Sequence, residues 1–318
     1  MFMITDDSIN CTSDAMPTFT VFTPTYNRIN KIKDVYRCLL NQSFYDFEWL
    51  IVDGGSDATD DYINTIIGDS PFIIRYFKQT SVGLHGAYNE GADYASGRLF
   101  VTLHSDDTIV PDALEKILFE WEAIPLLDQT SYSGIWARCC YKDGSIIGRK
   151  FPSKIVDSTY QEFVIGLNYR SELFPMVRTD IVKKFKFPND SAYRFIPEGY
   201  IWAAIGRFFR TRYIDVGLRV YDSQSLDQQS TEKLTSPKMI KKNSGSIFLY
   251  YQSLVTNDLS IINKHPLQSI RVLCLYSYYG HLSGKGLLVQ LASIRTYAKL
   301  LIVVLQPVIY CIKFLKTQ

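Results

Sequence analysis

The first 110 residues alternate short apolar segments with segments of helical periodicity, and this alternation limits the possible folds most. Apolar segments of strand length cover 19–23, 48–52, 73–77 and 99–103. Between the first two, apolar residues recur on one face of a helix: Ile32, Val35, Tyr36, Leu39 and Leu40. Strands that alternate with helices run parallel through right-handed crossovers. The pattern therefore predicts an α/β protein with a mostly parallel central sheet flanked by helices.

Polar and glycine-containing segments follow the expected strands. They are 24–28 (Pro-Thr-Tyr-Asn-Arg), 53–57 (Asp-Gly-Gly-Ser-Asp), 83–92, and 104–107 (His-Ser-Asp-Asp). In open α/β sheets, ligands bind at this edge. The adjacent Asp106 and Asp107 suit a divalent cation that carries phosphate oxygens, or they cap the helix expected after Pro111. Gly-x-Gly-x-x-Gly after the first strand and Gly-x-x-x-x-Gly-Lys-Ser/Thr are both missing from the sequence, which disfavours a dinucleotide-binding fold and a phosphate-loop NTPase.

The four segments, in this order and spacing, resemble family 2 glycosyltransferases of the GT-A fold, of the type that builds bacterial surface polysaccharides. The resemblance implies a nucleotide-diphospho-sugar donor, with a UDP-sugar favoured, and Mg²⁺ or Mn²⁺ as cofactor. The residues it assigns to the nucleotide are Pro24, Tyr26, Arg28, Asp53, Arg75 and Ser105, and those it assigns to the donor sugar and diphosphate are His85, Asp106 and Asp107. Asp53 would accept from a ring N–H of the base. The implied metal ligands are Asp106 and His104; His104 stands where the motif often has Asp, and packing is its alternative role, as it is for Tyr26 and Arg75.

Glu198 is the candidate general base. Residues of an apolar helix face follow it at Tyr200, Ile201, Trp202, Ile205 and Phe208, so it should lie at a helix N-terminus. Inverting sugar transfer needs a base that takes the proton of the acceptor hydroxyl, and partial burial would raise the pKa of Glu198 toward the working pH. The alternative is a glutamate that only stabilises the helix dipole.

The segment between the donor motifs and the tail should extend the sheet. We expect a helix at 113–122, a hairpin of strands 132–141 and 145–151, a short strand at 173–177 and a last strand at 212–221. The polar segment 222–230 could close over the donor. Residues 1–237 would form the GT-A domain, with a donor half at 18–120 and an acceptor half at 121–237.

Residues 238–318 differ in character from the rest of the chain. They carry ten Lys or Arg and one acidic residue, within a chain whose net charge is +2. One apolar stripe runs from 287 to 305, and 300–312 is apolar but shorter than the roughly twenty residues a membrane span needs. We expect a basic, amphipathic helical extension that contacts an anionic membrane through 285–318, a helical cap or an oligomer interface being the alternatives.

The resemblance implies that the acceptor is a growing glycan or a polyprenyl-linked glycan. We expect the enzyme on the cytoplasmic face of the cell membrane, because its cysteines suit free thiols and its N-terminus does not resemble a signal peptide. The basic residues of the tail interleave with Leu and Ile, which is untypical of a nucleic-acid-binding face. Two other functions fit less well: a sugar-phosphate nucleotidyltransferase, which needs a Gly-rich basic loop after the first strand, and an inactive nucleotide-sugar-binding scaffold.

Overall fold

The computed structural model describes residues 16–190, 192–193, 195–221, 236–256, 264–294 and 298–306. Of the predicted features, the loop 222–230 and the apolar end of the tail at 307–312 lie outside the described residues, as do Arg295, Lys313 and Lys316.

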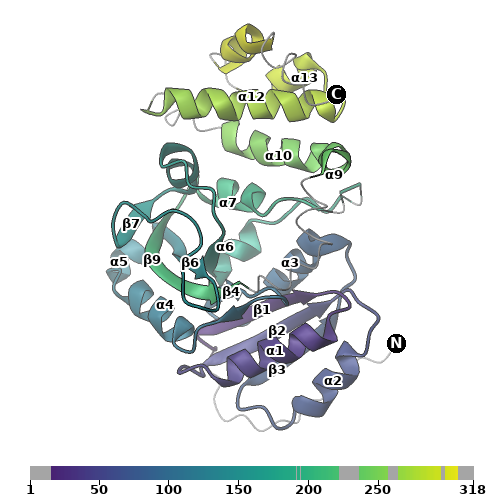
Figure 1. The fold of residues 1–318 in the computed structure, drawn as a ribbon, viewed down its shortest axis with the longest axis vertical. Helices are drawn as coiled ribbons and strands as arrows, with labels where there is room; N and C mark the ends of the chain where they lie inside the picture. Colours follow the sequence, from purple (N-terminus) through teal and green to yellow (C-terminus); the bar gives the residue numbers. More distant parts are fainter. Residues whose placement is uncertain are drawn as a thin grey trace.

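Within the described residues, one nine-stranded sheet runs through the molecule in the order β3-β2-β1-β4-β8-β6-β9-β5, and β7 pairs with β9 (Figure 1). Its first four strands are parallel: β1 (Phe19–Thr25), β2 (Phe47–Asp53), β3 (Ile73–Lys78) and β4 (Leu99–Thr102). These are the four strands predicted from the apolar segments. Because they are parallel, their carboxyl ends, with the polar segments that follow, meet at one edge of the sheet.

The other strands make the second half of the sheet mixed. They are β5 (Thr108–Ile109), β6 (Tyr132–Cys140), β7 (Ile155–Ser158), β8 (Leu173–Arg178) and β9 (Arg210–Val220). β8 runs antiparallel to both β4 and β6, whereas β6 and β9 are parallel. The antiparallel pair β4–β8 is therefore the seam that joins the parallel part of the sheet to its mixed part.

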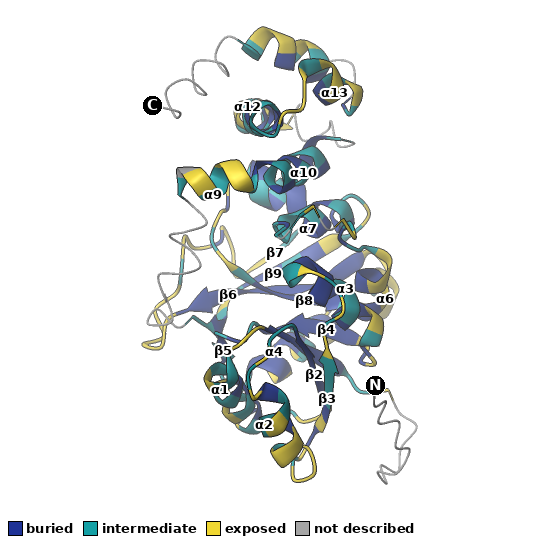
Figure 2. Ribbon diagram, turned by 90° about the vertical axis from the view of Figure 1, so that its right-hand side faces the viewer, coloured by how far each residue is buried: buried dark blue, intermediate teal, exposed yellow. Residues whose placement is uncertain are grey.

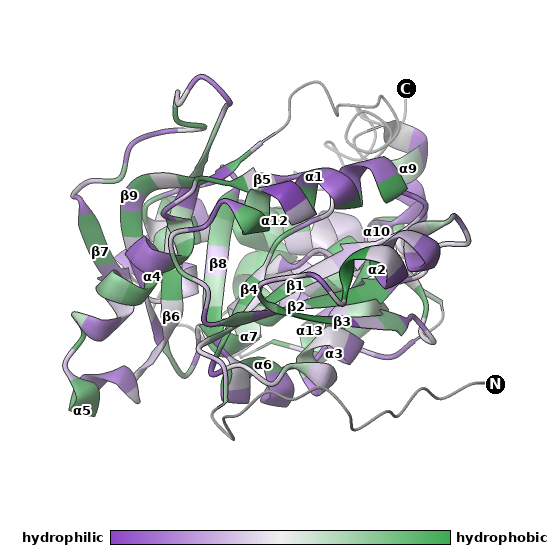
Figure 3. Ribbon diagram, turned by 90° about the horizontal axis from the view of Figure 1, so that it is seen from below, coloured by the Kyte–Doolittle hydropathy of each residue, from purple (hydrophilic) through white to green (hydrophobic). Residues whose placement is uncertain are grey.

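Helices cover both faces of the sheet. One face carries α1 (Ile29–Leu40), α2 (Thr59–Ile66) and α4 (Ala113–Glu122), and the other carries α3 (Gly83–Tyr94), α6 (Thr179–Lys184) and α7 (Gly199–Ile205). Figure 2 shows most of the strands as buried, and Figure 3 shows β1, β2 and β4 as hydrophobic between helices that bear hydrophilic residues. Two hydrophobic cores result, one on each face, and α5 (Leu126–Gln129) adds a short exposed turn after α4.

The predicted hairpin of 132–141 and 145–151 is wrong. Its first strand exists as β6, but residues 145–151 contribute only an isolated bridge between Cys140 and Ile146. β9 occupies one edge of β6, and β8 occupies the other at residues 134–138, so a hairpin partner can pair only with the last residues of β6. The chain instead pairs β7 with β9, and a π-helix, η1 (Glu162–Gly166), follows it.

The C-terminal helices stack on the acceptor half. They are α9 (Pro237–Lys242), α10 (Ser244–Val255), α12 (Pro266–Leu282), α13 (Leu287–Ala292) and a helical segment at 298–306. α10 packs on α7, and α12 packs on α10 (Figure 1). Among the described residues, no helix is both long and apolar enough to cross a membrane.

Buried Gln290 fastens the last helices to α12. Its side chain accepts a hydrogen bond from Ser277 Oγ at 2.8 Å, and its backbone carbonyl accepts one from Tyr276 Oη at 2.7 Å. The predicted apolar stripe of 287–305 is not one continuous helix, because residues 293–294 form a turn and a bend after α13. It is not wholly buried either, since Leu288 is 82% exposed.

Candidate active site

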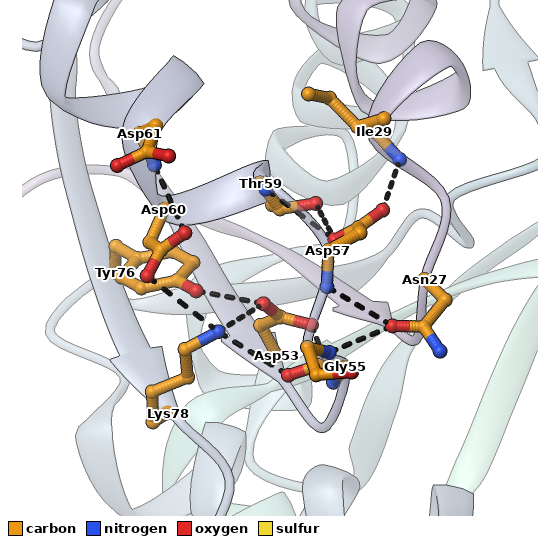
Figure 4. Close-up of polar contacts among 11 residues, drawn as sticks. Asn27, Ile29, Asp53, Gly55, Asp57, Thr59, Asp60, Asp61, Tyr76 and Lys78 are labelled. Carbon is orange, nitrogen blue, oxygen red and sulfur yellow. Dashed lines mark hydrogen bonds and ion pairs between the residues drawn. The ribbon is translucent and has the colours of Figure 1, made fainter.

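Asp53 ends β2 and is buried in a set of polar contacts (Figure 4). Its Oδ2 accepts hydrogen bonds from Tyr76 Oη at 2.7 Å and from Lys78 Nζ at 2.9 Å, and its Oδ1 accepts one from the backbone N–H of Gly55 at 2.8 Å. Lys78 ends the neighbouring strand in register with Asp53. The prediction did not include Lys78 or Tyr76, although the position of Lys78 at the same strand edge was a usable signal.

Asn27 holds the first two strand-end turns together. Its Oδ1 accepts from the backbone N–H of Ser56 at 2.7 Å and of Asp57 at 3.2 Å (Figure 4), and its own backbone adopts the left-handed conformation with φ 52°. A Cβ at Gly55 would lie 2.4 Å from the backbone nitrogen of Asn27. Glycine is therefore required at 55 for the two turns to touch.

A cavity of about 590 Å³ opens at the carboxyl ends of the parallel strands. The predicted residues that line it are Pro24, Tyr26, Arg28, His104, Ser105 and Asp106. Gly54, Gln79, Ser81, Leu84 and Thr25 complete much of its wall. Tyr26 is 67% exposed, so its ring offers a flat face to a ligand. Thr25 Oγ1 is buried without a hydrogen-bond partner among the described residues, which leaves it for a ligand to satisfy.

Asp106 forms an ion pair with Arg28 inside this cavity, with 2.6 Å between Oδ2 and Nη1. Burial raises the pKa of Asp106, but the charge and hydrogen bond of Arg28 outweigh it, so the pKa lies below its usual value. Asp106 is thus a carboxylate anion that faces the cavity next to a guanidinium group.

Asp107 points away from the cavity toward Arg219, which is 4% exposed. Their closest atoms, Oδ2 and Nε, are 3.5 Å apart, and burial raises the pKa of Asp107 to about 6. The structure therefore does not bring Asp107 to the donor site with Asp106. Arg219 was not predicted, since only the pairing of β5 with β9 brings it here. Neither Asp caps α4, whose N-cap residue is Asp112, so the capping alternative is wrong.

His104 joins the cavity to Glu198, 94 positions later in the chain. His104 Nε2 and Glu198 Oε1 are 3.0 Å apart, and Glu198 lies directly before α7, as predicted from the helical spacing. Burial lowers the pKa of His104 while Glu198 raises it, and the net pKa is raised. Burial raises the pKa of Glu198, but the hydrogen bond and charge of His104 outweigh it. The expectation that the pKa of Glu198 is raised toward the working pH is therefore wrong: its net pKa is lowered, and the group is held as an anion.

His85 lies close to this pair. It lines a narrow hollow together with Pro24, His104 and Glu198, and it is 4% exposed. Burial lowers the pKa of His85, and its Nδ1 has no hydrogen-bond partner among the described residues. A neutral imidazole with an unpaired buried nitrogen is available to a hydroxyl group of a ligand.

Arg75 lies outside the cavity. Its Nη1 contacts Glu48 Oε2 at 3.0 Å, and it donates to the carbonyl of Tyr94 and to Ser96 Oγ, each at 2.6 Å. These contacts tie β3 to the start of β2 and to the end of α3. The nucleotide contact predicted for Arg75 gains no support from this position.

The residues present fit a divalent metal only if the donor supplies further ligands. Among the described residues, no group of three or more His, Cys, Asp or Glu could hold a metal ion. Asp106 is the one carboxylate among the described residues that line the cavity, and Nε2 of His104 is engaged with Glu198. Magnesium sites built from one or two carboxylates and the phosphates of the substrate are common, and Asp106 suits a site of that kind.

Comparison with known proteins decides the family. The model of Glycosyl transferase family 2 matches residues 20–137. This part of the chain is a family 2 glycosyltransferase domain. The chain is 29% identical over 176 residues to an uncharacterized glycosyltransferase of Haemophilus influenzae, a match that covers 55% of this chain and 67% of that protein.

A second relative has a named activity. It is the GalNAc(5)-diNAcBac-PP-undecaprenol beta-1,3-glucosyltransferase of Campylobacter jejuni, 23% identical over 212 residues, which cover 65% of each chain. A mannosyltransferase of Pyrobaculum calidifontis, solved with GDP-Man and Mn²⁺, shares the fold with a TM-score of 0.55, at 13% identity over 96% of this chain and 85% of that one. The chain thus shares the GT-A fold, and its residues 20–137 match the family 2 glycosyltransferases that the motifs predicted.

Proposed function

We propose that the enzyme moves a sugar from a UDP-sugar to a hydroxyl group of a glycan, with inversion at the anomeric carbon. The observation that carries this proposal is the contact between His104 and Glu198. His104 lines both the cavity that holds Asp106 and the narrow hollow that Glu198 lines, so this carboxylate lies next to the cavity. Donor and acceptor hydroxyl would meet there.

In this proposal the strand-end turns bind the nucleotide. Tyr26 would stack on the base and Pro24 would flank it. Asp53, which contacts Lys78, would accept from the ring N–H of the base. Arg28 and Ser105 would contact the nucleotide where the diphosphate begins. Each of these residues lies at the carboxyl edge of the parallel strands, where α/β sheets bind nucleotides.

Next to the nucleotide, Asp106 and His85 would hold the diphosphate and the donor sugar. A divalent cation, Mg²⁺ or Mn²⁺, would be held by Asp106 and would neutralise the charge that develops on the leaving diphosphate. Arg28 already offers a positive charge at the same carboxylate and would contact the phosphates directly. His85 Nδ1 would receive a hydrogen bond from a sugar hydroxyl.

Glu198 would take the proton of the attacking hydroxyl. Its lowered pKa keeps it ionised at neutral pH, so it is ready to accept a proton, while His104 fixes its orientation. The proton would pass from the acceptor oxygen to a Glu198 carboxylate oxygen as the new glycosidic bond forms and the bond to the diphosphate breaks.

For the acceptor we propose a glycan on a polyprenyl diphosphate carrier at the inner face of the cell membrane. The C. jejuni relative is named for an undecaprenol-linked substrate. The C-terminal helices expose a group of apolar side chains, Leu288, Val289, Leu300, Val303 and Val304, with Lys285 and Lys299 among them. Exposed apolar side chains combined with basic ones favour peripheral contact with an anionic membrane.

The first experiment is calorimetric titration of the purified chain with UDP, GDP and dTDP, each with Mn²⁺ and with EDTA. We expect UDP to bind most tightly, and more tightly with Mn²⁺, because the cation screens the repulsion between Asp106 and the diphosphate. Asp106→Ala should weaken binding with Mn²⁺ by tenfold or more, on the order of 1.4 kcal/mol. The matched control is Asp69→Ala, an exposed carboxylate after α2.

The outcomes separate the parts of the proposal. Tight binding of GDP in place of UDP would contradict the assignment of the donor. Equal binding with EDTA would contradict the role of the metal. If none of the three nucleotides binds, the cavity is not a donor site, and an inactive scaffold becomes the better interpretation.

A further inference from the structure

A second cavity, of about 340 Å³, lies on the acceptor side of the molecule between η1, α10 and α12. The described residues that line it fall into two groups. The apolar ones are Val164, Ile165, Leu254, Leu267, Val272 and Leu275, and the polar or aromatic ones are Asn168, Arg170, Tyr250, Tyr251, Gln268 and Arg271. None of the residues that line the donor cavity belongs to either group. A site of this size and composition fits a small ligand, or part of a larger one, that is partly hydrocarbon.

The polar side of the cavity is positively charged. Two arginines line it, and no carboxylate is found among its described lining residues. Both arginines are exposed, and neither forms an ion pair within the described part of the chain. Guanidinium groups bind phosphate oxygens in a bidentate manner. Two arginines without ion-pair partners, next to an apolar cavity, are therefore complementary to a phosphate that carries a hydrocarbon chain.

Arg170 is held in place for such a contact. Asn168 adopts the left-handed conformation, with φ 52°, and its Oδ1 accepts from Nε and Nη2 of Arg170 at 3.1 and 2.6 Å. This leaves Nη1 of Arg170 without a hydrogen bond to any described residue. Because the partner of Arg170 is a neutral amide, its positive charge remains for a ligand.

The cavity adjoins the candidate base through one layer of aromatic side chains. Tyr250, which lines the cavity, packs so closely on the first residue of α7 that a Cβ at Gly199 would lie 2.4 Å from its ring. The same Cβ would lie 2.8 Å from Tyr160 Oη. Glu198 is the residue directly before Gly199. A ligand anchored in this cavity would therefore lie next to the site of sugar transfer.

We propose that this cavity binds the phosphate groups and the adjoining hydrocarbon of a lipid-linked acceptor. The inference rests on the proposed function, whose acceptor it specifies: a lipid diphosphate, held by Arg170 and Arg271 and by the apolar floor, with its glycan directed past Tyr250 to Glu198. The volume accommodates the head group and the first part of the chain only, so the rest of the lipid would remain outside.

The test measures binding of farnesyl diphosphate, a soluble lipid diphosphate, to the full chain by calorimetry. We expect saturable binding, at least tenfold weaker in the double variant Arg170→Ala/Arg271→Ala, because two charge-assisted contacts are lost. The matched control is Arg37→Ala, an exposed arginine on α1, which should bind as the wild type does. Inorganic diphosphate, farnesol and dioctanoyl phosphatidylglycerol are the comparison ligands, and each should bind at least tenfold more weakly.

Several results would overturn the inference. Binding of inorganic diphosphate as tight as that of farnesyl diphosphate would show a plain anion site, and equal binding of the phosphatidylglycerol would show a site for membrane lipid. Unchanged binding in the double variant would place the ligand elsewhere, and thermal melts would show whether that variant is folded. UDP is titrated into the same samples: if UDP binds and farnesyl diphosphate does not, this inference fails alone, whereas a failure of UDP concerns the donor site.

Discussion

At the scale of single residues, opposite charges meet in pairs throughout the candidate site. Lys78 contacts Asp53, Arg28 contacts Asp106, Arg219 contacts Asp107, and His104 contacts Glu198. A buried carboxylate without such a partner would be protonated or would destabilise the fold. The partners therefore preserve negative charge at Asp106 and Glu198 in a partly desolvated site, where a cation or a proton has to be received.

Glu198→Gln tests the base. The amide keeps an oxygen that can accept from His104 but cannot take a proton, so we expect kcat for transfer to fall by about 10² to 10⁴. Binding of UDP should change by less than about twofold, because the residue lies outside the nucleotide part of the cavity. The measurements are steady-state transfer kinetics and calorimetry.

Glu122→Gln, on the exposed side of α4, is the control for this substitution and should leave kcat unchanged. If the Glu198→Gln enzyme retains the wild-type kcat and the same rate-limiting step, another group takes the proton. A parallel loss of UDP binding would instead indicate damage to the whole site.

At the scale of elements, contact between α3 and the sheet depends on a glycine. A Cβ at Gly91 would lie 2.3 Å from the ring of Phe22 on β1. Phe22 cannot move away easily, because it is fully buried, stacks on Phe100 and meets Tyr88 edge to face. Small residues lie four positions apart at Ala87 and Gly91 of this helix and at its C-cap residue Ala95, and this spacing allows the close approach.

Gly91→Ala should lower the free energy of unfolding. Overpacking of a rigid core costs about 1–3 kcal/mol, and the higher helix propensity of Ala returns about 1 kcal/mol, so we expect a net loss in urea or thermal unfolding. Gly68→Ala is the matched control, because a Cβ at Gly68 meets nothing within 4 Å, and it should be neutral or slightly stabilising. A Gly91→Ala protein as stable as the wild type would mean that β1 and α3 separate without cost.

At the scale of the whole molecule, the basic C-terminal helices form part of the folded body. They connect to the site through successive layers: α12 on α10, and α10 on α7, which begins next to Glu198. Their exposed apolar side chains lie on the segments farthest from the donor half in Figure 1. Contact with a membrane through these helices would leave the donor cavity open to solvent.

Vesicle sedimentation tests this contact. We expect binding to anionic vesicles at low salt, less binding to neutral ones, and a decrease as salt screens the basic residues. Leu288→Asp/Val304→Asp should weaken binding several-fold, since two exposed apolar side chains are replaced by negative charges. Leu126→Asp/Leu127→Asp, equally exposed on α5, is the control. Equal losses in both variants, or no preference for anionic vesicles, would contradict the proposed membrane face.

The sequence patterns predicted more of the fold than of the candidate site. Alternation and residue type placed the first four strands and the start of α7, since both are local properties. The hairpin prediction failed because the partners of β6 are decided by long-range pairing. For the same reason the contact between His104 and Glu198 could not be predicted: both residues were named from the sequence, but they meet only when the segment after β4 and the start of α7 come together.

The seam between β4 and β8 has a consequence for how such an enzyme diverges. Its pairs, Leu99 with Arg178, Phe100 with Val177 and Val101 with Met176, are joined through the backbone, so the connection does not depend on which side chains the acceptor half carries. Substitutions can therefore change, residue by residue, the half that we propose to receive the glycan, while the half that we propose to bind the nucleotide keeps its backbone connection. A new linkage specificity would arise in this scaffold by substitution on one side of a fixed backbone joint.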